Sequence, residues 1–211
     1  MANPATLADL RSQVDDLAGL GLSPTERDRL LNEGHVELCV RSGWSKGTLA
    51  LGPGVAGQEL YPFPATLRKP LKVTVAGLPY TNTDQAALDS YRLGRTYIPG
   101  DGAWWINYGA TAARSIGITP ATDGGTISVL GIVTPATMTA DADQPIVPPD
   151  FRQAIVDYVS AISLGAQEDL IEDRVFHRDE FERQVIRLRG LAMEIEEGDA
   201  TGNVQLAGVH F

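Results

Sequence analysis

The residue types that could carry out chemistry are few in this sequence and lie far apart. Its histidines are His35, His177 and His210, and its single cysteine is Cys39. No HExxH, CxxC or pair of histidines four residues apart is present, so the sequence predicts no zinc site. There is no GxSxG motif, and Cys39 has neither a basic neighbour nor a helix N-terminus to activate its thiol. We therefore expect no catalytic residue, metal or cofactor, and we expect Cys39 to be a buried packing residue.

Other candidate ligand sites match known motifs only in part. "GPGVAG" (52–57) lacks the following lysine and helix of a phosphate-binding loop, so a turn before a strand explains it better. "DADQ" (141–144) alternates carboxylates but lacks the glycine and the bidentate glutamate of a calcium loop. We expect His35 to complete the packing of a helix and His177 to be solvated. His210 lies next to the last residue, a poor place for a rigid ligand.

The overall charge limits the kinds of partner. The chain has 17 basic and 27 acidic residues and a net charge of −10, and such a surface does not attract nucleic acid. If DNA meets this protein, we expect it to slide past. Hydrophobic residues make up 43% of the chain, enough for a packed core, but no run approaches the ~18 apolar residues of a membrane-spanning helix. "MANPATLADL" has no basic segment before an apolar stretch, so no signal peptide is expected.

Two helices are predicted near the start of the chain. Apolar residues recur there at helical spacing: Leu7, Leu10, Val14 and Leu17. The next stretch, "SPTE", is a helix start, with Ser23 as N-cap, Pro24 at the first helical position and Glu26 completing a capping box. This second helix is expected to run to about Arg41, with an apolar side made of Leu30, Leu31, Leu38 and Cys39.

Residues 43–145 consist of short β-rich runs separated by glycine and proline. The runs include "QELYPF", "LKVTVAGLPY", "AWWINYG" and "TISVLGIV", with turn signals such as "PGDG" and "DGG". This spacing predicts a small antiparallel sheet. Residues 83–93 are expected to form either a helical turn or a lid between two strands. Trp104 and Trp105 would point to opposite faces of a strand, so either one is exposed or at an interface, or both are packed.

Helix returns with "DQPIVPPDFRQAIVDYVSAI" (143–162). Pro148 and Pro149 cannot donate backbone hydrogen bonds and suit an entry segment, and Asp150 and Gln153 fit a capping box. One continuous apolar face follows at helical spacing, made of Phe151, Ala154, Ile155, Tyr158, Val159 and Ile162. The predicted core of a helical bundle is therefore Phe151, Ile155, Tyr158, Val159 and Ile162.

A second C-terminal helix is predicted at roughly residues 172–196, and Gly198 is expected to end it. Its apolar stripe is Phe181, Val185, Leu188, Ala192 and Ile195. The acidic end "EIEEGD" (194–199) opposes the helix dipole, so we expect either fraying or a partner that offsets the cost. The tail that follows is too short to pack as a domain, yet it holds apolar residues that a purely disordered tail would lack: Val204, Leu206, Val209 and Phe211.

Together these patterns predict an α+β protein. We expect an antiparallel helical bundle from both chain ends, an inserted small antiparallel β-sheet subdomain and an extended C-terminal tail. The expected boundaries are 1–43 for the N-terminal helices, 44–147 for the β-rich subdomain, 148–197 for the C-terminal helices and 198–211 for the tail.

The order of these elements resembles the head-to-tail adaptor (head completion, or connector) proteins of tailed bacteriophages. The resemblance covers roughly residues 5–190. It lies in "LSPTERDRLLNEGHVEL", "YPFPATLRKPLKVTVAGLPY", "GTISVLGIVTPATMTADADQPIVPPDF" and the helix containing "IVDYVSA". Such proteins typically show a capped helix with a Leu-Asn-Glu-Ala-like centre. Gly34 stands here where alanine would be expected, and this departure is expected to loosen the helix.

The resemblance implies a structural protein of the virion neck, made in the host cytoplasm. It implies a homo-oligomeric ring, commonly a dodecamer, attached below the portal protein after DNA packaging. Such a ring extends the DNA channel, contacts the genome passively and joins a downstream neck or tail protein. No enzymatic activity and no membrane association are implied. We expect the C-terminal tail to dock on the portal through its apolar residues Val204, Leu206, Val209 and Phe211. Val204 and Leu206 are two apart, as in a strand, and would add to the edge of a partner's sheet, with Phe211 as a terminal anchor. The alternative is a frayed terminus.

Other functions fit the same residues. A tail-completion or stopper protein of the neck would also form a ring, although such proteins are usually dominated by β-barrel. A small hydrolase would need convergent, pKa-shifted residues in a concave pocket, and no such set is evident in the sequence. A scaffold or binding module unrelated to phage is the third alternative.

Overall fold

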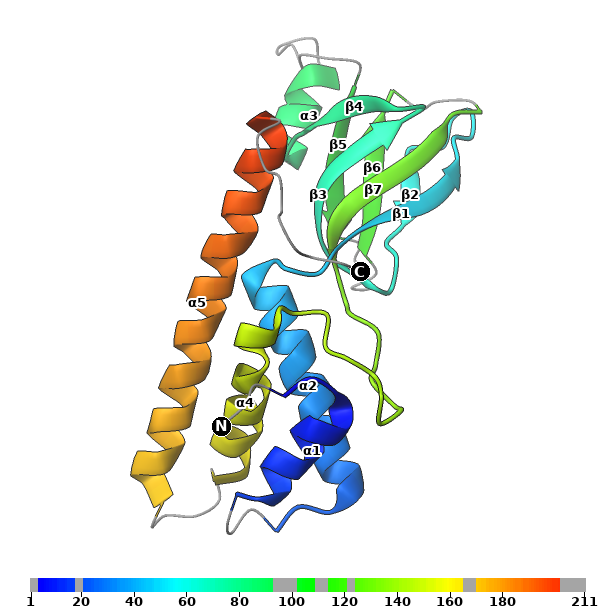
Figure 1. Ribbon diagram of the computed structural model, residues 1–211. Helices are drawn as coiled ribbons and strands as arrows, with labels where there is room; N and C mark the ends of the chain where they lie inside the picture. The colour runs from blue at the N-terminus through cyan, green and yellow to red at the C-terminus, as the bar shows by residue number, and fades with distance from the viewer. Residues whose placement is uncertain are drawn as a thin grey trace. The chain divides into compact units, whose positions relative to one another are not determined.

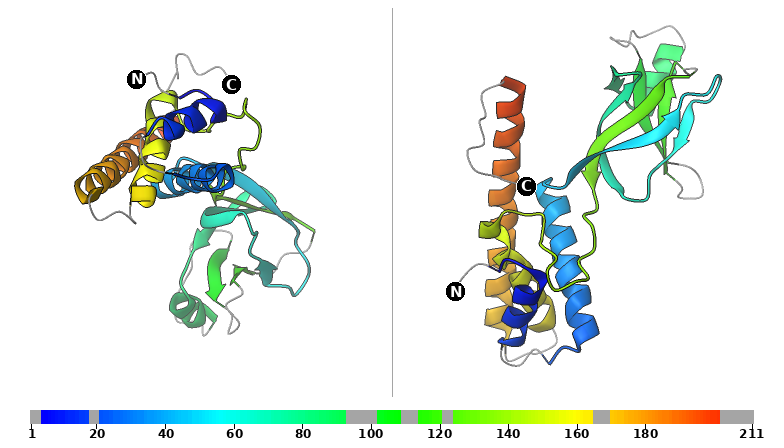
Figure 2. Two further views of the ribbon diagram at one scale, coloured as in Figure 1. Left: turned by 90° about the horizontal axis from the view of Figure 1, so that it is seen from below. Right: turned by 45° about the vertical axis from the view of Figure 1, so that its right-hand side comes forward.

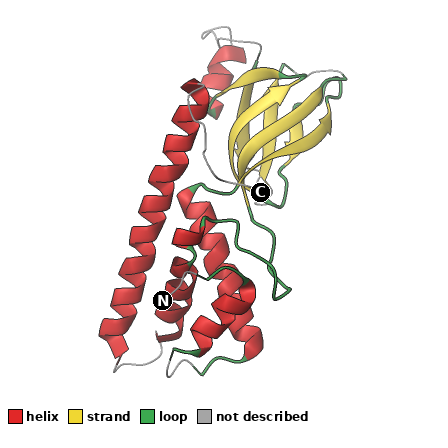
Figure 3. Ribbon diagram, in the orientation of Figure 1, coloured by secondary structure: helices red, strands yellow, loops and turns green. Residues whose placement is uncertain are grey.

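The computed structural model describes residues 4–17, 21–92, 102–108, 114–120, 124–164 and 170–201 (Figure 1). The chain forms two compact units, a helical unit from Met1–Ser45 with Thr134–Phe211 and a β unit from Lys46–Val133. Figure 3 colours helices red and strands yellow; the strands all belong to the β unit, which also contains the helix Gln85–Arg92. Residues 134–147, assigned above to the β-rich region, are part of the helical unit.

The helical elements are α1 (Leu7–Asp15), α2 (Pro24–Ser42), the short 3-10 helix η1 (Pro149–Phe151), α4 (Gln153–Ser163) and α5 (Ile171–Thr201). The start of α1 is a capping box that the sequence analysis missed, with Thr6 and Asp9 each accepting from the other's backbone N–H. At the start of α2 the Ser23 side chain accepts from the backbone N–H of Glu26, as expected of an N-cap. Among the described residues the Glu26 side chain does not complete the predicted capping box. That helix ends at Gly43, whose φ of 74° lies in the left-handed region that favours glycine.

The two C-terminal helices differ from the prediction at their ends. Asp150 is not the N-cap of α4, because a 3-10 turn occupies 149–151 and Arg152, which makes no side-chain cap, is the residue before α4. Helix α5 does not end at Gly198 but continues to Thr201.

The core of the helical unit is built around α4, which packs against α1, α2 and α5. From both directions of Figure 2, α5 lies alongside α4. The buried apolar residues come from all four helices and the segment before α4: Leu7, Leu10, Val14, Leu30, Leu31, Leu38, Cys39, Met138, Val147, Phe151, Ala154, Ile155, Val156, Val159, Phe181, Val185 and Leu188. Helix α5 has 31 residues and is about 46 Å long at 1.5 Å per residue. Because α4 has only 11 residues, much of α5 extends past it.

The residues expected in the bundle core have different environments. Buried are Phe151, Ile155 and Val159. Tyr158 is half-buried, with its hydroxyl donating to the Glu33 carboxylate at 2.8 Å. Ile162 is 51% exposed and lies outside the core. It falls in the last turn of α4, where Leu164, immediately after the helix, takes the buried position instead.

The irregular segment before α4 is held by side chains of the helices. The Asn32 amide of α2 donates to the carbonyl of Met138 at 3.0 Å and accepts from its N–H at 2.7 Å, so the two pair as neighbouring strands would. His35, buried in the same helix, accepts the N–H of Ile146 at 3.2 Å through Nε2. Both side chains therefore satisfy backbone groups that have no regular partner.

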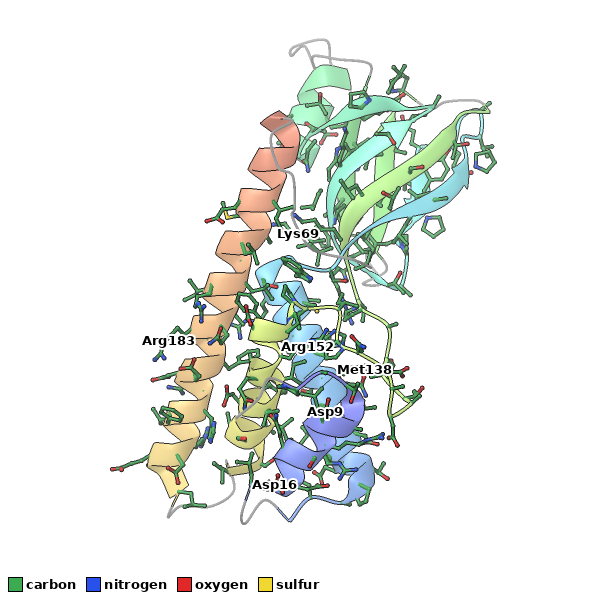
Figure 4. All side chains as sticks on the ribbon, viewed as in Figure 1. Asp9, Asp16, Lys69, Met138, Arg152 and Arg183 are labelled. Carbon is green, nitrogen blue, oxygen red and sulfur yellow. The ribbon has the colours of Figure 1, made fainter. Side chains whose placement is uncertain are left out.

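Arg152 is the third such side chain, and it is only 8% exposed (Figure 4). Its guanidinium donates to the carbonyls of Val147, Ala5 and Pro145. Burial lowers the pKa of the Arg152 guanidinium from its ordinary value. This one side chain joins the segment before α1 and the proline-led segment to the start of α4.

The β unit contains β1 (Lys46–Pro53), β2 (Leu60–Pro62), β3 (Leu67–Val75), β4 (Leu78–Asn82), α3 (Gln85–Arg92), β5 (Ala103–Tyr108), β6 (Arg114–Thr119) and β7 (Thr126–Val133). Its strands form one seven-stranded sheet in the order β1-β7-β3-β4-β5-β6-β2. The segment that was predicted as a helical turn or a lid is the helix α3.

The predicted fold class is therefore wrong in its description of the sheet. The sheet is mixed and nearly closed rather than small and antiparallel, because β5 runs parallel to β4. The prediction assumed that consecutive runs pair through tight turns. A connection containing α3 instead joins β4 to β5, as parallel pairing requires, and β7 inserts between β1 and β3. A small sheet inserted in a helical bundle is not supported.

The β unit has an apolar core of its own: Tyr61, Leu67, Val73, Val75, Tyr80, Trp104, Ile116, Ile118, Ile127 and Val129. Trp104 and Trp105 are both buried, at 1% and 4% exposure, although they leave opposite faces of β5. Gly117 of β6 makes room for the second ring, because a Cβ there would lie 2.1 Å from the Trp105 indole. Neither tryptophan is therefore a surface anchor.

Gly34 provides a close contact between α2 and α4. A Cβ at this position would lie 2.9 Å from the Tyr158 ring and 3.2 Å from its Cβ. We expect Gly34→Ala to lower the free energy of unfolding by about 1–3 kcal/mol, because overpacking outweighs the gain in helix propensity. The matched control is Gly190→Ala in α5, where an added Cβ would meet no atom within 4 Å other than those of the adjoining helix backbone. It should raise stability by up to about 1 kcal/mol. Chemical denaturation of both variants checks this, and a stabilised Gly34→Ala would contradict the packing argument.

His35 predicts an acid-sensitive helical unit. Burial, with a smaller contribution from Arg152, lowers its pKa from 6.5 to about 4. Between these values the unfolded chain binds more protons than the folded chain, so the free energy of unfolding should fall as pH falls from about 6.5 to about 4. The contribution is at most about 1.4 kcal/mol per pH unit. The free energy of unfolding, measured by urea denaturation at several pH values in this range, should change less with pH in His35→Gln than in the parent chain. An equal dependence on pH in the two proteins would count against this role of His35.

Candidate docking surfaces

The described residues offer no cluster suited to metal binding. Within the described ranges no group of three or more His, Cys, Asp or Glu side chains could hold a metal ion. Cys39 is buried, and burial raises the pKa of its thiol to about 12, which makes it a poor nucleophile. His210 lies outside the described residues.

The prediction that His177 is solvated is wrong. Its Nδ1 lies 2.8 Å from Oδ1 of Asp157, and its side chain is 21% exposed. Asp157 is buried on α4, and burial raises the pKa of its carboxyl while the His177 hydrogen bond partly offsets this effect. The pair links α4 to α5. An aspartate inside an otherwise apolar helix was the signal in the sequence that a polar partner must face it.

A shallow hollow of about 280 Å³ lies on the β unit. Its lining is Phe63, Pro64, Ala65, Leu67, Arg68 and Arg114. The Arg114 guanidinium stacks over the Phe63 ring at 4.7 Å from its centroid. Because the lining contains no carboxylate, histidine or cysteine, the hollow does not support the hydrolase alternative.

The net charge of −10 conceals an uneven distribution between the two units. The β unit contains 7 basic and 5 acidic residues, a net charge of +2. The helical unit contains 10 basic and 22 acidic residues, a net charge of −12. The chain is therefore acidic only in its helical unit.

All three lysines of the chain lie on one exposed face of the sheet, formed by β1, β7 and β3. Lys46 on β1 and Lys69 on β3 are both in register with Ile132 of the strand between them. Lys72 is in register with Leu130 of the same central strand. Directly opposed residues share a face, so these five residues form one surface, which we call the lysine face. Lys69 is labelled in Figure 4.

The lysine face has an apolar centre. Leu130, on the central strand, is 37% exposed, and Ile132 beside it is 9% exposed. The lysines lie on β1 and β3, on either side of Leu130 and Ile132. Lys46 and Lys69 are about 10 Å apart, which is twice the usual distance between neighbouring strands. Among the described residues no ion pair involves Lys69 or Lys72. A charged rim around an apolar centre is the anatomy of a protein interface.

A second exposed surface lies on the first turns of α5, on the side away from its buried stripe. Ile171, Val175 and Phe176 are 57%, 41% and 63% exposed. Glu172 and Asp179 share this side, because at 100° per residue all five positions fall within an arc of about 140° around the helix axis. We call these five residues the α5 outer face. Asp179 contacts Arg178 at 3.5 Å, an exposed pair of small energetic value.

The predicted tail residues cannot be placed. Val204, Leu206, Val209 and Phe211 all lie outside the described residues. Sequence reasoning also missed both surfaces defined above, because the lysine face depends on strand register and the α5 outer face on which side of that helix is buried. The cluster "LRKPLK" in an acidic chain was the one available signal for the lysine face.

Comparison with known proteins identifies the family. The family model described as SU10 adaptor protein matches residues 5–205. A search of the curated proteins found no match. In the described part of the chain, none of the helices is both long and apolar enough for a membrane span. The family match covers nearly the whole chain and confirms the resemblance set out above, so the chain belongs to the SU10 adaptor protein family of phage head-to-tail adaptors.

Proposed function

We propose that this protein forms a ring below the portal of a tailed bacteriophage, extends the DNA channel and joins the next neck or tail protein. The observation that carries the proposal is the family match over residues 5–205. It favours an adaptor over a tail-completion or stopper protein, a hydrolase or a module unrelated to phage. By resemblance the ring has twelve copies, lies in the virion neck and is made in the host cytoplasm.

Two features of the helical unit support an assembly role. Apolar side chains are exposed on α5 at Phe176, Ile186 and Met193, with 63%, 69% and 52% of their surface accessible. Such side chains gain free energy when a neighbouring subunit covers them. The strong acidity of the helical unit suits a channel component, because a negative wall repels phosphate and lets DNA pass without adhesion. The role of the protein is structural, with passive contact to the genome.

We also propose that the C-terminal tail docks on the portal. Val204 and Leu206 are two residues apart, so in a strand they would share one face while the polar residues on either side point away. An extended segment of this kind can add to the edge of a partner's sheet, with Phe211 as an apolar anchor.

Truncation after Thr201 tests the tail. The truncated chain should fold normally, because it retains α5 and every core residue of the helical unit, but it should fail to join purified portal-containing heads. Two double variants are compared. The first changes the apolar pair (Val204→Ser and Leu206→Ser), and the second changes the polar pair beside it (Asn203→Ser and Gln205→Ser). The apolar pair should lose attachment and the polar pair should keep it, as scored by electron microscopy and co-sedimentation with heads. Normal attachment of the truncated chain would place portal docking on the helical body.

Particles that lack this protein test the proposal as a whole. They should package DNA but carry no tail, and purified protein added to them should restore tail joining and a visible ring at the portal. Tailed, infectious particles made without the protein would overturn the neck function.

A further inference from the structure

We propose that the lysine face of one copy binds the α5 outer face of the next copy in the ring. This inference rests on the proposed ring function and adds the contact that would build it. Two different surfaces of the same chain meet in such a contact, so each copy presents both halves. Contacts of this head-to-tail kind close into rings when the rotation between copies allows it.

The chemistry of the two surfaces is complementary. The lysine face places Lys46, Lys69 and Lys72 around the apolar side chains of Leu130 and Ile132 on the central strand. Its counterpart combines exposed apolar side chains with the opposite charge. Along the helix axis, Glu172 and Asp179 are about 10 Å apart at 1.5 Å per residue, with Val175 and Phe176 between them. Opposite charges at the rim steer two copies together and fix their orientation, while the apolar centres supply the burial.

The carboxylates of the α5 outer face suit this role. Glu172 and Asp179 lie among Ile171, Val175 and Phe176, each of which is more than one-third exposed. The face belongs to a unit with a net charge of −12, and the lysine face to a unit of +2. Attraction between the units of different copies is therefore favoured over attraction between two like units.

The dimensions also agree. From Ile171 to Asp179 the helix rises about 12 Å at 1.5 Å per residue. The lysine face is about 10 Å wide between Lys46 and Lys69 at the usual spacing of strands. A helix with its side chains is about 10 Å across, so the first turns of α5 can lie over the central strand with lysines on either side.

A second copy explains the lysine face better than DNA does. Phosphate contact requires cations but gains nothing from an exposed apolar line, and Leu130 is 37% exposed at the centre of this face. The acidic helical unit of the same chain also repels duplex DNA. The partner must be acidic and partly apolar, and the α5 outer face has both properties.

Charge exchange tests the contact. The sheet variant carries Lys46→Glu, Lys69→Glu and Lys72→Glu, and the helix variant carries Glu172→Lys and Asp179→Lys. Each variant alone should self-associate about tenfold or more weakly than the parent chain, because like charges then meet across the contact. An equimolar mixture of the two, and a chain that carries all five changes, should recover association. Sedimentation of the full chain over a concentration series, free and with purified portal protein, measures this.

Two controls separate the contact from general effects of charge and folding. Asp16→Lys with Glu26→Lys makes the same change in net charge as the helix variant, at exposed positions just after α1 and in the first turn of α2, and it should leave association unchanged. Thermal melts followed by circular dichroism show whether each variant is folded. A further sheet variant, with the three lysines changed to glutamine, should weaken association less than the glutamate version does.

The outcomes distinguish this contact from the proposed function. Rings that form equally well from the sheet variant, or a mixture that fails to recover association, would overturn the contact and leave the ring intact. A parent chain that stays monomeric both alone and with portal protein would overturn the ring and the contact together. If the sheet variant loses duplex DNA binding while its self-association is unchanged, the lysine face binds DNA and the inference is wrong.

Discussion

The helical unit depends on the buried guanidinium of Arg152. An arginine can donate five hydrogen bonds in a planar fork, and Arg152 donates to three carbonyls, one before α1 and two in the segment that leads to α4. The segment before α4 is rich in proline and has few backbone partners of its own, so its buried carbonyls need donors from elsewhere. Asn32 and His35 act in the same way from α2. Chain ends more than a hundred residues apart are thus joined by side chain to backbone hydrogen bonds as well as by apolar packing.

The sequence predicted what local chemistry determines. The N-cap at Ser23 and the apolar spacing that places Ile155 and Phe181 follow from residues within a few turns of one another. The sheet was mispredicted because its order depends on long-range pairing, above all the insertion of β7 between β1 and β3. His177 was mispredicted because its surroundings in the sequence are charged, whereas its partner Asp157 lies twenty residues away on another helix. Of the candidate surfaces, the lysine face required the register of three strands before its residues could be grouped.

The division of charge changes how the composition should be interpreted. A single net charge describes a chain well only when its charges are spread evenly, and here one unit is weakly basic while the other is strongly acidic. In the ring proposed above, this arrangement would combine repulsion of DNA phosphate with attraction between unlike units of neighbouring copies. The proposed function requires both properties, because the genome would have to move freely through a ring whose subunits hold together.

Cys39 has a practical consequence for work on this protein. Its thiol is buried in the helical core and its pKa is raised to about 12, so alkylating reagents meet almost no thiolate at neutral pH while the fold is intact. The native chain therefore behaves as if it were free of cysteine, and fluorophores or spin labels can be attached at introduced cysteines without replacing Cys39. The same thiol becomes accessible once the core opens. Pulsed alkylation of Cys39 followed by mass spectrometry can therefore measure the rate at which the helical core unfolds.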